Sequence, residues 1–506
     1  MDTLLSSTYV HLVLDISAKT CVVALLVLLL RVLGWAVNLF LIAPLSDPLY
    51  HLPGPKGAFL ESHLELVMNP AFSTSTHKDW RTLFGQTFRF HGFGGHDLRL
   101  MTFDARALAH ILNDSSTYDK PWQTRSFLGC LIGNGIFSVE GAEHTKQRRI
   151  IGPAFSQEAI KRMNPIFLSK AQEVLEQWKG IHHVSNRPLA LVESSGVIVD
   201  VANWMSRAAF DVIGLAGFDQ DFKAVQDESS DVYHAYRSIF NIADKGLGLR
   251  EIVDLYFPIL RKIWVNDDIK TVNDSFKVIN HLGKVIIAER KEMAKLGRLD
   301  EKSDLLSILV TSNLSSKSSK RLSDRELIDQ CSTFLMAGSD SVSVALSWCF
   351  HLLARHPEVQ SRLRKDLSDL RRPSPSPESV GLDDNSGHAD RIGAKGPVNT
   401  SKTLDDIEYL DFVVKEVLRF CPPVHATIRV AKKDDMIPVS SSRSNGDTVA
   451  GDQSKPEYIK IRKGTYIHVP IEGLSYSEDL WGSDALEFKS LERYRKIEID
   501  KSTWAS

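Results

Sequence analysis

The stretch that decides the fold is ELIDQCSTFLMAGSDSVSVALSWCFHLL, residues Glu326–Leu353. Apolar side chains recur at helical spacing on most of its sides, which predicts one long helix through the middle of a helical domain. Ala337 and Gly338 remove side-chain bulk, although a glycine in mid-helix costs about 1 kcal/mol relative to alanine. Asp340 and Ser341 add an acid and a hydroxyl beside that gap. The segment therefore indicates either room for a flat ligand or a close helix-packing contact, with Asp340 held by a partner or by water.

Downstream, Glu416 and Arg419 lie three residues apart, so they share one face of the helix predicted for Thr403–Phe420. The residues around the pair are apolar, and Pro422 and Pro423 follow the helix end. A buried arginine–carboxylate pair can be bidentate and can fix a fold locally. A surface helix gives the same spacing by chance, but the apolar context favours a buried pair.

Upstream, His144 and Arg148 are four residues apart on one helical face, with Lys146 and Arg149 beside them. Such a pair can donate hydrogen bonds to an anionic group, for example a carboxylate. A solvated basic helix surface is the alternative interpretation, and the pattern alone favours it.

The N-terminal region is apolar from about Thr20 to Ala43, apart from Arg31 and Asn38. That length can span ~30 Å of hydrocarbon, and Arg31 near its middle costs on the order of 2.5–3.5 kcal/mol. A cleaved signal peptide is the rival interpretation, but the stretch is long and no small-x-small cleavage site follows. We expect residues 1–50 to be a single-pass membrane anchor with its flanks. The Pro/Gly-rich segment Leu52–Gly57 cannot continue a helix and predicts a hinge that lets the body swing away from the bilayer.

Composition excludes several other classes. The formal net charge of -2 gives no global signal for nucleic acid, so we expect no nucleic-acid partner. The five cysteines include no CxxC pair, which argues against a zinc site and a disulfide framework and suits a body facing the cytosol. They are Cys21, Cys130, Cys331, Cys349 and Cys421.

The remaining patterns are mostly helical, with a few short strands and two polar loops. We predict a small sheet over Phe88–Phe103, a helix over Val199–Gly214, strands at Tyr458–Ile461 and Tyr466–Val469, and exposed loops over Arg371–Thr400 and Ser440–Pro456.

Together these motifs resemble the cytochrome P450 family of haem-thiolate monooxygenases, from about Leu52 to Tyr494, and most of all its membrane-bound fungal members. The resemblance implies a mainly α domain with small β-sheets over residues 51–506. Asp340 and Ser341 would relay protons to bound dioxygen, beside the haem at Ala337 and Gly338. The resemblance also implies that His144, Arg148 and Arg429 bind the haem propionates. It implies that Arg493 completes a structural triad with Glu416 and Arg419.

The chain departs from the family pattern at three places. Ser341 stands where a threonine is usual, and Ser490-Leu491 replaces a usual proline before Glu492. The loop Phe-x-x-Gly-x-x-x-Cys-x-Gly, which supplies the thiolate ligand of the iron, does not occur in the sequence. Cys421 directly follows the Glu–Arg helix and does not match that position. We therefore expect a P450-like domain truncated before the haem-thiolate loop, with no metal ligand in this chain.

The resemblance implies a haem b monooxygenase that hydroxylates or otherwise oxidises an apolar small molecule, for example in terpenoid secondary metabolism. Electrons would come from NADPH through a membrane-bound flavoprotein reductase, docking near Lys146 and Arg149, with the anchor in the endoplasmic reticulum membrane. Two alternatives stay open. One is a non-catalytic paralogue or an incomplete gene model; the other is a membrane-anchored protein that binds an apolar ligand without chemistry.

Overall fold

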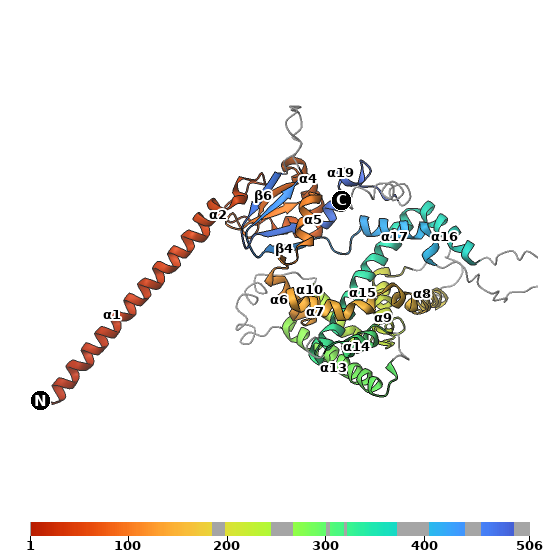
Figure 1. Ribbon diagram of the computed structural model, residues 1–506, viewed down its shortest axis with the longest axis horizontal. Coiled ribbons are helices and arrows are strands. Elements are labelled where there is room, and N and C mark those ends of the chain that lie inside the picture. Colours follow the sequence, from red (N-terminus) through yellow and green to blue (C-terminus); the bar gives the residue numbers. More distant parts are fainter. Residues whose placement is uncertain are drawn as a thin grey trace, which may run out of the picture. The chain divides into compact units, whose positions relative to one another are not determined.

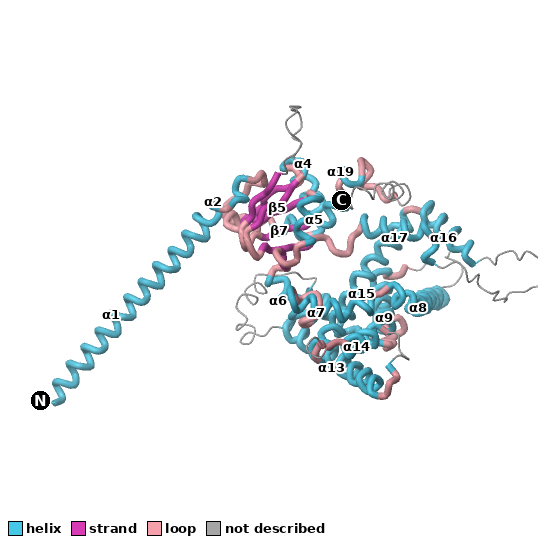
Figure 2. The backbone as a smooth tube through the Cα atoms, viewed as in Figure 1, coloured by secondary structure: helices cyan, strands magenta, loops and turns pink. Residues whose placement is uncertain are grey.

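The computed structural model describes residues 2–184, 198–243, 267–299, 304–317, 321–371, 404–440 and 457–489. It divides into two compact units (Figure 1). The sheet unit consists of Met1–Pro121 and His425–Leu474, and the helical unit consists of Trp122–Val424 and Ser475–Ser506. All strands in the described ranges belong to the sheet unit (Figure 2). The chain is thus mainly helical with small sheets, as predicted.

The sheet unit begins with a long apolar helix, α1 (Asp2–Val37), continued by a π-helical turn (Asn38–Ile42) and α2 (Ala43–Ser46). Val22–Ser46 is 25 residues long with a mean hydropathy of 2.4 and is not buried. Among the described helices, this one is long and apolar enough to cross a membrane. The helix runs past Pro44, because a proline in the first turn of α2 loses no intrahelical hydrogen bond.

The segment Leu52–Gly57 is not helical, as predicted, but it is fixed to the sheet. The main-chain N–H of Arg89 donates to the Pro53 carbonyl at 2.9 Å, and its Nε donates to the Leu52 carbonyl at 3.0 Å. Gly54 packs so closely that a Cβ there would lie 2.0 Å from the Arg89 carbonyl oxygen. The prediction of a swinging hinge at Leu52–Gly57 was therefore wrong for this part of the chain, since these contacts tie it to the first strand.

The main sheet has the strand order β1-β2-β7-β4-β3. β2 and β7 pair in parallel, and the other neighbours pair antiparallel. β5 and β6 form a second, antiparallel sheet. The strands are β1 (Thr87–His91), β2 (Leu98–Thr102), β3 (Tyr118–Asp119), β4 (Thr427–Ala431), β5 (Asp435–Val439), β6 (Glu457–Ile461) and β7 (Tyr466–Val469). The sheet expected over Phe88–Phe103 and both downstream strands are confirmed.

Four short helices complete the sheet unit: α3 (Leu64–Met68), α4 (Pro70–Phe84), α5 (Ala105–Asn113) and α18 (Ile471–Ser475), the last of which crosses into the helical unit at its final residue. Apolar residues between the strands and α5 form the core, among them Leu100, Ile111 and Ile467. Glu472 of α18 is buried and accepts hydrogen bonds from Ser73 at 2.9 Å and Thr74 at 2.7 Å of α4.

The helical unit is built around α15 (Asp324–Arg355). Its start is set by a capping box between Ser323 and Glu326, which is why the helix begins two residues before the predicted Glu326. The other long helices are α8 (Gln157–Val184), α9 (Val201–Phe218) and α13 (Asp267–Lys295). The shorter ones are α6 (Trp122–Ile132), α7 (Gly141–Ile151), α10 (Asp231–Ala243), α14 (Leu305–Ser315), α16 (Pro357–Arg371), α17 (Glu408–Phe420) and α19 (Glu478–Trp481).

Two predicted helices differ at their ends. α9 starts at Val201, because Asp200 caps it by accepting the N–H of Asn203 at 3.0 Å, and it runs on to Phe218. α17 starts at Glu408 and not at Thr403, after a short 3-10 turn at Leu404–Asp406. The two predicted loops fall almost wholly in residues 372–403 and 441–456, outside the described residues.

Candidate functional site

The break in the central helix packs against a neighbouring helix. A Cβ added to Gly338 would lie 2.8 Å from Cδ1 of Ile213 on α9, so any larger residue would require the Ile213 side chain to shift. The contact supports the helix-packing interpretation of Gly338 over the expectation that it opens space for a flat ligand. It also explains why a buried helix tolerates the cost of a glycine.

The acid and the hydroxyl lie one turn further along α15. Asp340 and Ser341 are both half-buried. The Ser341 Oγ donates to the Ala337 carbonyl at 2.8 Å, so this hydroxyl bonds back to its own helix. Beyond it, α15 leaves large apolar side chains partly uncovered, with Val342 43% and Trp348 44% exposed. An acid and a hydroxyl thus precede a partly exposed apolar stretch of α15.

Helix α7 is docked on α15 by its polar face. Lys146 Nζ lies 2.6 Å from Glu326 Oε1, and Gln330 Nε2 donates to Gln147 Oε1 at 2.9 Å. Burial favours the protonated form of Glu326, but Lys146 and the capping N–H of Ser323 outweigh it and lower its pKa to about 2. Lys146 is therefore occupied within the fold, which corrects its expected place on a free basic docking surface.

The predicted propionate donors differ in burial and in position. His144 is half-buried, and Arg148 and Arg149 are exposed. Arg429 lies on β4 in the sheet unit, where its Nη1 donates to Thr427 Oγ1 at 2.8 Å and to the Ile428 carbonyl at 2.9 Å. His144 and Arg148 thus share a helix, whereas Arg429 belongs to the other unit.

The Glu416–Arg419 pair is buried, as the apolar context predicted. Arg419 Nε and Nη2 donate to the two carboxylate oxygens of Glu416, both at 2.8 Å. The remaining donors reach three main-chain carbonyls, of Ser475 at 2.7 Å, Ala485 at 2.8 Å and Glu487 at 3.1 Å. The Lys489 N–H donates back to Glu416 Oε1 at 2.9 Å. The pair therefore gathers residues 475–489 onto α17, and its expected third member, Arg493, lies outside the described residues.

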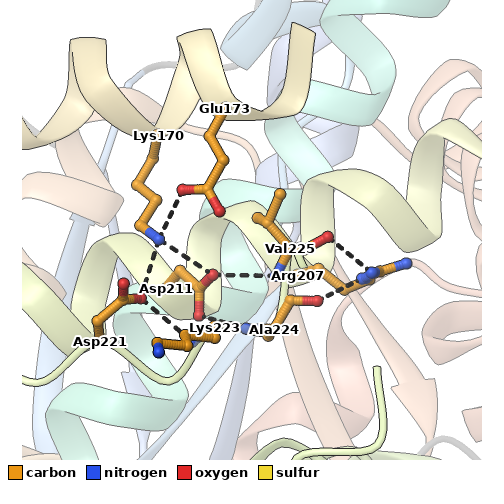
Figure 3. Close-up of polar contacts among 8 residues, drawn as sticks. All are labelled: Lys170, Glu173, Arg207, Asp211, Asp221, Lys223, Ala224 and Val225. Carbon is orange, nitrogen blue, oxygen red and sulfur yellow. Dashed lines mark hydrogen bonds and ion pairs between the residues drawn. The ribbon is translucent and has the colours of Figure 1, made fainter. Parts of the chain in front are cut away.

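A second buried polar cluster joins α8, α9 and the loop after α9 (Figure 3). Lys170 Nζ contacts Glu173 at 2.8 Å, Asp221 at 2.9 Å and the fully buried Asp211 at 3.5 Å. Burial raises the pKa of Asp211, against the N–H groups of Val225 and Ala224 and the charge of Lys170. Asp211 stands two residues before Ile213, so the cluster holds the part of α9 that meets Gly338. Sequence reasoning missed Lys170 and Asp221, because no local pattern links residues that far apart.

Comparison with known proteins gives a consistent result. The family model for cytochrome P450 matches residues 53–502. Cytochrome P450 monooxygenase 205 of Postia placenta is 30% identical to this chain, covering 96% of this chain and 84% of the relative. Cytochrome P450 monooxygenase claP of Ampulloclitocybe clavipes is 31% identical over 86% of this chain and 75% of the relative. Ganoderic acid synthetase of Ganoderma lucidum is 28% identical, covering 88% of this chain and 78% of the relative.

This chain belongs to the cytochrome P450 family. P450 proteins are enzymes that use a bound haem and a redox partner to oxidise apolar substrates, so family membership implies a haem cofactor. Part of the structure fits that group. The partly uncovered apolar stretch of α15 suits a flat apolar ring, and His144 and Arg148 are the donor types that carboxylates of a porphyrin require.

Two of the described cysteines, Cys331 and Cys349, lie on α15 and are poor candidates for the iron ligand of a P450. Cys331 is buried in the core, where burial raises the pKa of its thiol to about 12. Burial also raises the pKa of the Cys349 thiol. Cys421 follows the last residue of α17, and its N–H donates to the Val417 carbonyl at 2.8 Å. Burial therefore disfavours the thiolate form of the two cysteines of α15, which is the form that would ligate iron.

Proposed function

We propose that this P450 binds haem b and oxidises an apolar small molecule of secondary metabolism, such as a terpenoid, at a membrane. The observation that carries the proposal is the pair Asp340 and Ser341 at the start of the partly uncovered apolar stretch of α15. The name of one relative, ganoderic acid synthetase, supports a terpenoid-like substrate. The helix Val22–Ser46 supports a single-pass anchor, which we assign to the endoplasmic reticulum with the body in the cytosol.

Haem ligated by a cysteine thiolate activates dioxygen for insertion into a C–H bond. The chain's own contribution is to position the substrate, exclude water and supply protons. His144 and Arg148 would hold one propionate; Arg429 is assigned to the other on the family resemblance. Asp340 would exchange protons with solvent, and the Ser341 hydroxyl would pass them on. To do so, the Ser341 side chain must release the Ala337 carbonyl, which a rotation about χ1 achieves.

Electrons would come from NADPH through a flavoprotein reductase. With Lys146 paired to Glu326, the exposed cations of α7 are Arg148 and Arg149. We therefore move the proposed docking surface to Arg149 and its exposed neighbours. Complementary charge there would mainly raise the association rate with the reductase.

A second candidate is ligand binding without oxidation, by a non-catalytic paralogue or by the product of an incomplete gene model. The sequence favours it in one respect, since the motif Phe-x-x-Gly-x-x-x-Cys-x-Gly is missing from the 506 residues. The genomic sequence past the codon for Ser506 separates these cases. A downstream frame that encodes the motif would favour the enzyme.

The test is a spectrum of the reduced protein with carbon monoxide, run on the 506-residue chain and on a form extended through the cysteine loop. We expect the 506-residue chain to lack the red-shifted Soret band of a thiolate haem and to show no turnover with a reductase, and the extended form to gain both. A thiolate band from the 506-residue chain that Cys421→Ser abolishes would show that Cys421 is the ligand. An extended form that binds haem through the thiolate but oxidises no apolar substrate would support the binding protein instead.

A further inference from the structure

A basic pocket lies between α13 and the first turn of α15, in the helical unit. Its cavity volume is about 470 Å³. Four side chains of α13 and one of α15 line it: Lys277, Asn280, His281, Lys284 and Arg325. Four of these side chains end in nitrogen alone, Asn280 ends in an amide, and the pocket lining contains no carboxylate. The pocket is therefore suited to an anion.

Helix geometry explains why these side chains converge. Lys277, His281 and Lys284 are spaced by four and three residues, so they share one face of α13. The opposite side of the helix is held against α15, where Gly283 would place a Cβ 3.4 Å from Ile328. Arg325 follows the capping residue Ser323 by two positions, so the α15 capping box fixes the place of its backbone.

The charges in the pocket are only partly balanced. Lys277 pairs with Asp274 at 2.7 Å, and Arg325 Nε pairs with Asp329 at 3.3 Å. Lys284 and His281 are exposed and form no ion pair within the described residues. Asp274 and Asp329 do not line the pocket, so the charged groups at its surface are all cationic and favour an anion.

A separate observation comes from Asn280. Its Oδ1 is buried and has no hydrogen-bond partner within the described residues. A buried acceptor without a donor is unfavourable. A turn of the Asn280 amide about χ2 exchanges its oxygen and nitrogen, and in that orientation a ligand O–H could supply the missing donor. The pocket thus offers cations for negative charge and one acceptor for a hydroxyl. A monoprotonated phosphate, or a phosphate ester with a neighbouring hydroxyl, has both groups.

We propose that this pocket binds a phosphate-bearing ligand, separately from the oxidation site. Arg325 precedes Asp340 by fifteen positions on one helix, about 22 Å along its axis. A ligand that bridges α13 and α15 binds the folded state only, so it stabilises that state in proportion to its occupancy. The pocket does not depend on haem, on the reductase or on the thiolate loop.

The test uses the full chain in nanodiscs of phosphatidylcholine, titrated with pyrophosphate at constant ionic strength and followed by calorimetry. We expect saturable binding at one site, weakened at least tenfold in the double variant Lys284→Glu/Arg325→Glu. The control Lys179→Glu/Lys161→Glu makes the same charge change on α8 and should bind within about twofold of the unmodified chain. Unchanged binding by the pocket variant, equal loss in the control, or no saturable binding by the unmodified chain would each overturn the proposal.

Two further arms identify the ligand chemistry. Citrate that competes as well as pyrophosphate would overturn the choice of phosphate, because the site would then respond to charge alone. The Asn280→Leu variant should lower affinity for pyrophosphate severalfold without changing its dependence on salt.

Nanodiscs that contain phosphatidic acid separate the sources of the phosphate. Competition from these nanodiscs assigns the pocket to a lipid headgroup, and unchanged pyrophosphate binding assigns it to a soluble phosphate compound.

Discussion

Replacing Arg419 by alanine tests the buried ion pair that joins α17 to residues 475–489. The guanidinium makes two hydrogen bonds to Glu416 and three to the carbonyls of Ser475, Ala485 and Glu487. The side chain of Glu416 is fully buried and that of Arg419 is 2% exposed. The variant would leave a buried carboxylate that has lost both hydrogen bonds from the guanidinium and still accepts the Lys489 N–H.

The cost follows from that geometry. Removing one partner of a buried ion pair typically costs ~3–5 kcal/mol, because the other charge stays buried. Three carbonyls also lose a charged donor, which adds to the loss, although such terms are not additive. Domains of this kind are stable by only about 5–15 kcal/mol, so Arg419→Ala should remove a large fraction of the free energy of unfolding.

The assay is the free energy of unfolding from urea titration in detergent, with the yield of folded protein as a second measure. Arg419→Lys should recover little, since an ammonium cannot serve two carboxylate oxygens and three carbonyls at once. The matched control lies on the same helix, where Lys415 pairs with Asp411 at 2.7 Å and both are about half exposed. Lys415→Ala should cost less than about 1 kcal/mol. Equal, small losses for Arg419→Ala and Lys415→Ala would refute the reasoning, because the buried pair would then behave as a surface pair.

The intact chain should pellet with membranes and resist alkaline carbonate, because Val22–Ser46 is long and apolar enough to insert, whereas a chain that starts at Leu52 should be released. Recovery of the intact chain in the soluble fraction would contradict the anchor. His77 is buried without a ring-nitrogen partner in the described structure, and burial lowers its pKa to about 4, against the charge of Glu472. The unfolded chain therefore binds the extra proton first, so stability should fall as pH falls from about 6.5 to 4, by up to about 3 kcal/mol. His77→Phe should make that part of a plot of urea midpoint against pH less steep, while a variant at the exposed His51 should follow the unmodified chain. A slope should remain, because burial also lowers the pKa values of His63, His91 and His468.

The spacing of apolar residues within single segments was enough to predict the helices and strands that have one face on a core. The apolar period of Glu326–Leu353 and the alternation at Tyr466–Val469 correspond to α15 and β7, because each pattern decides which side faces a core. The burial of Glu416 and Arg419 could be predicted from their apolar neighbours. The P450 fold class followed from the order of such motifs and not from any one of them.

Contacts between distant segments could not be predicted in the same way. Nothing near Gly338 in the sequence indicates that Ile213 fills the space above it. Lys170 meets Asp211 across 41 residues, with no shared motif. The segment Leu52–Gly57 looked like a free hinge because proline and glycine prevent a helix, yet they do not prevent pairing with Arg89. The roles of Asp340, Ser341 and Arg429 rest on the family resemblance, which no contact in their own neighbourhood in the described structure indicates.

The bonds of Arg419 also have a consequence for synthesis of the protein. The most distant carbonyl that Arg419 binds lies 68 residues later in the chain, at Glu487. At about 5–20 residues per second, the ribosome needs roughly 3–14 s to add that stretch. During this interval Glu416 and Arg419 have been synthesised, but the carbonyl groups that Arg419 binds in residues 475–489 have not. The nascent helix should therefore be a target for chaperones until residues 475–489 leave the ribosome, and a stall in this interval should send the chain to degradation.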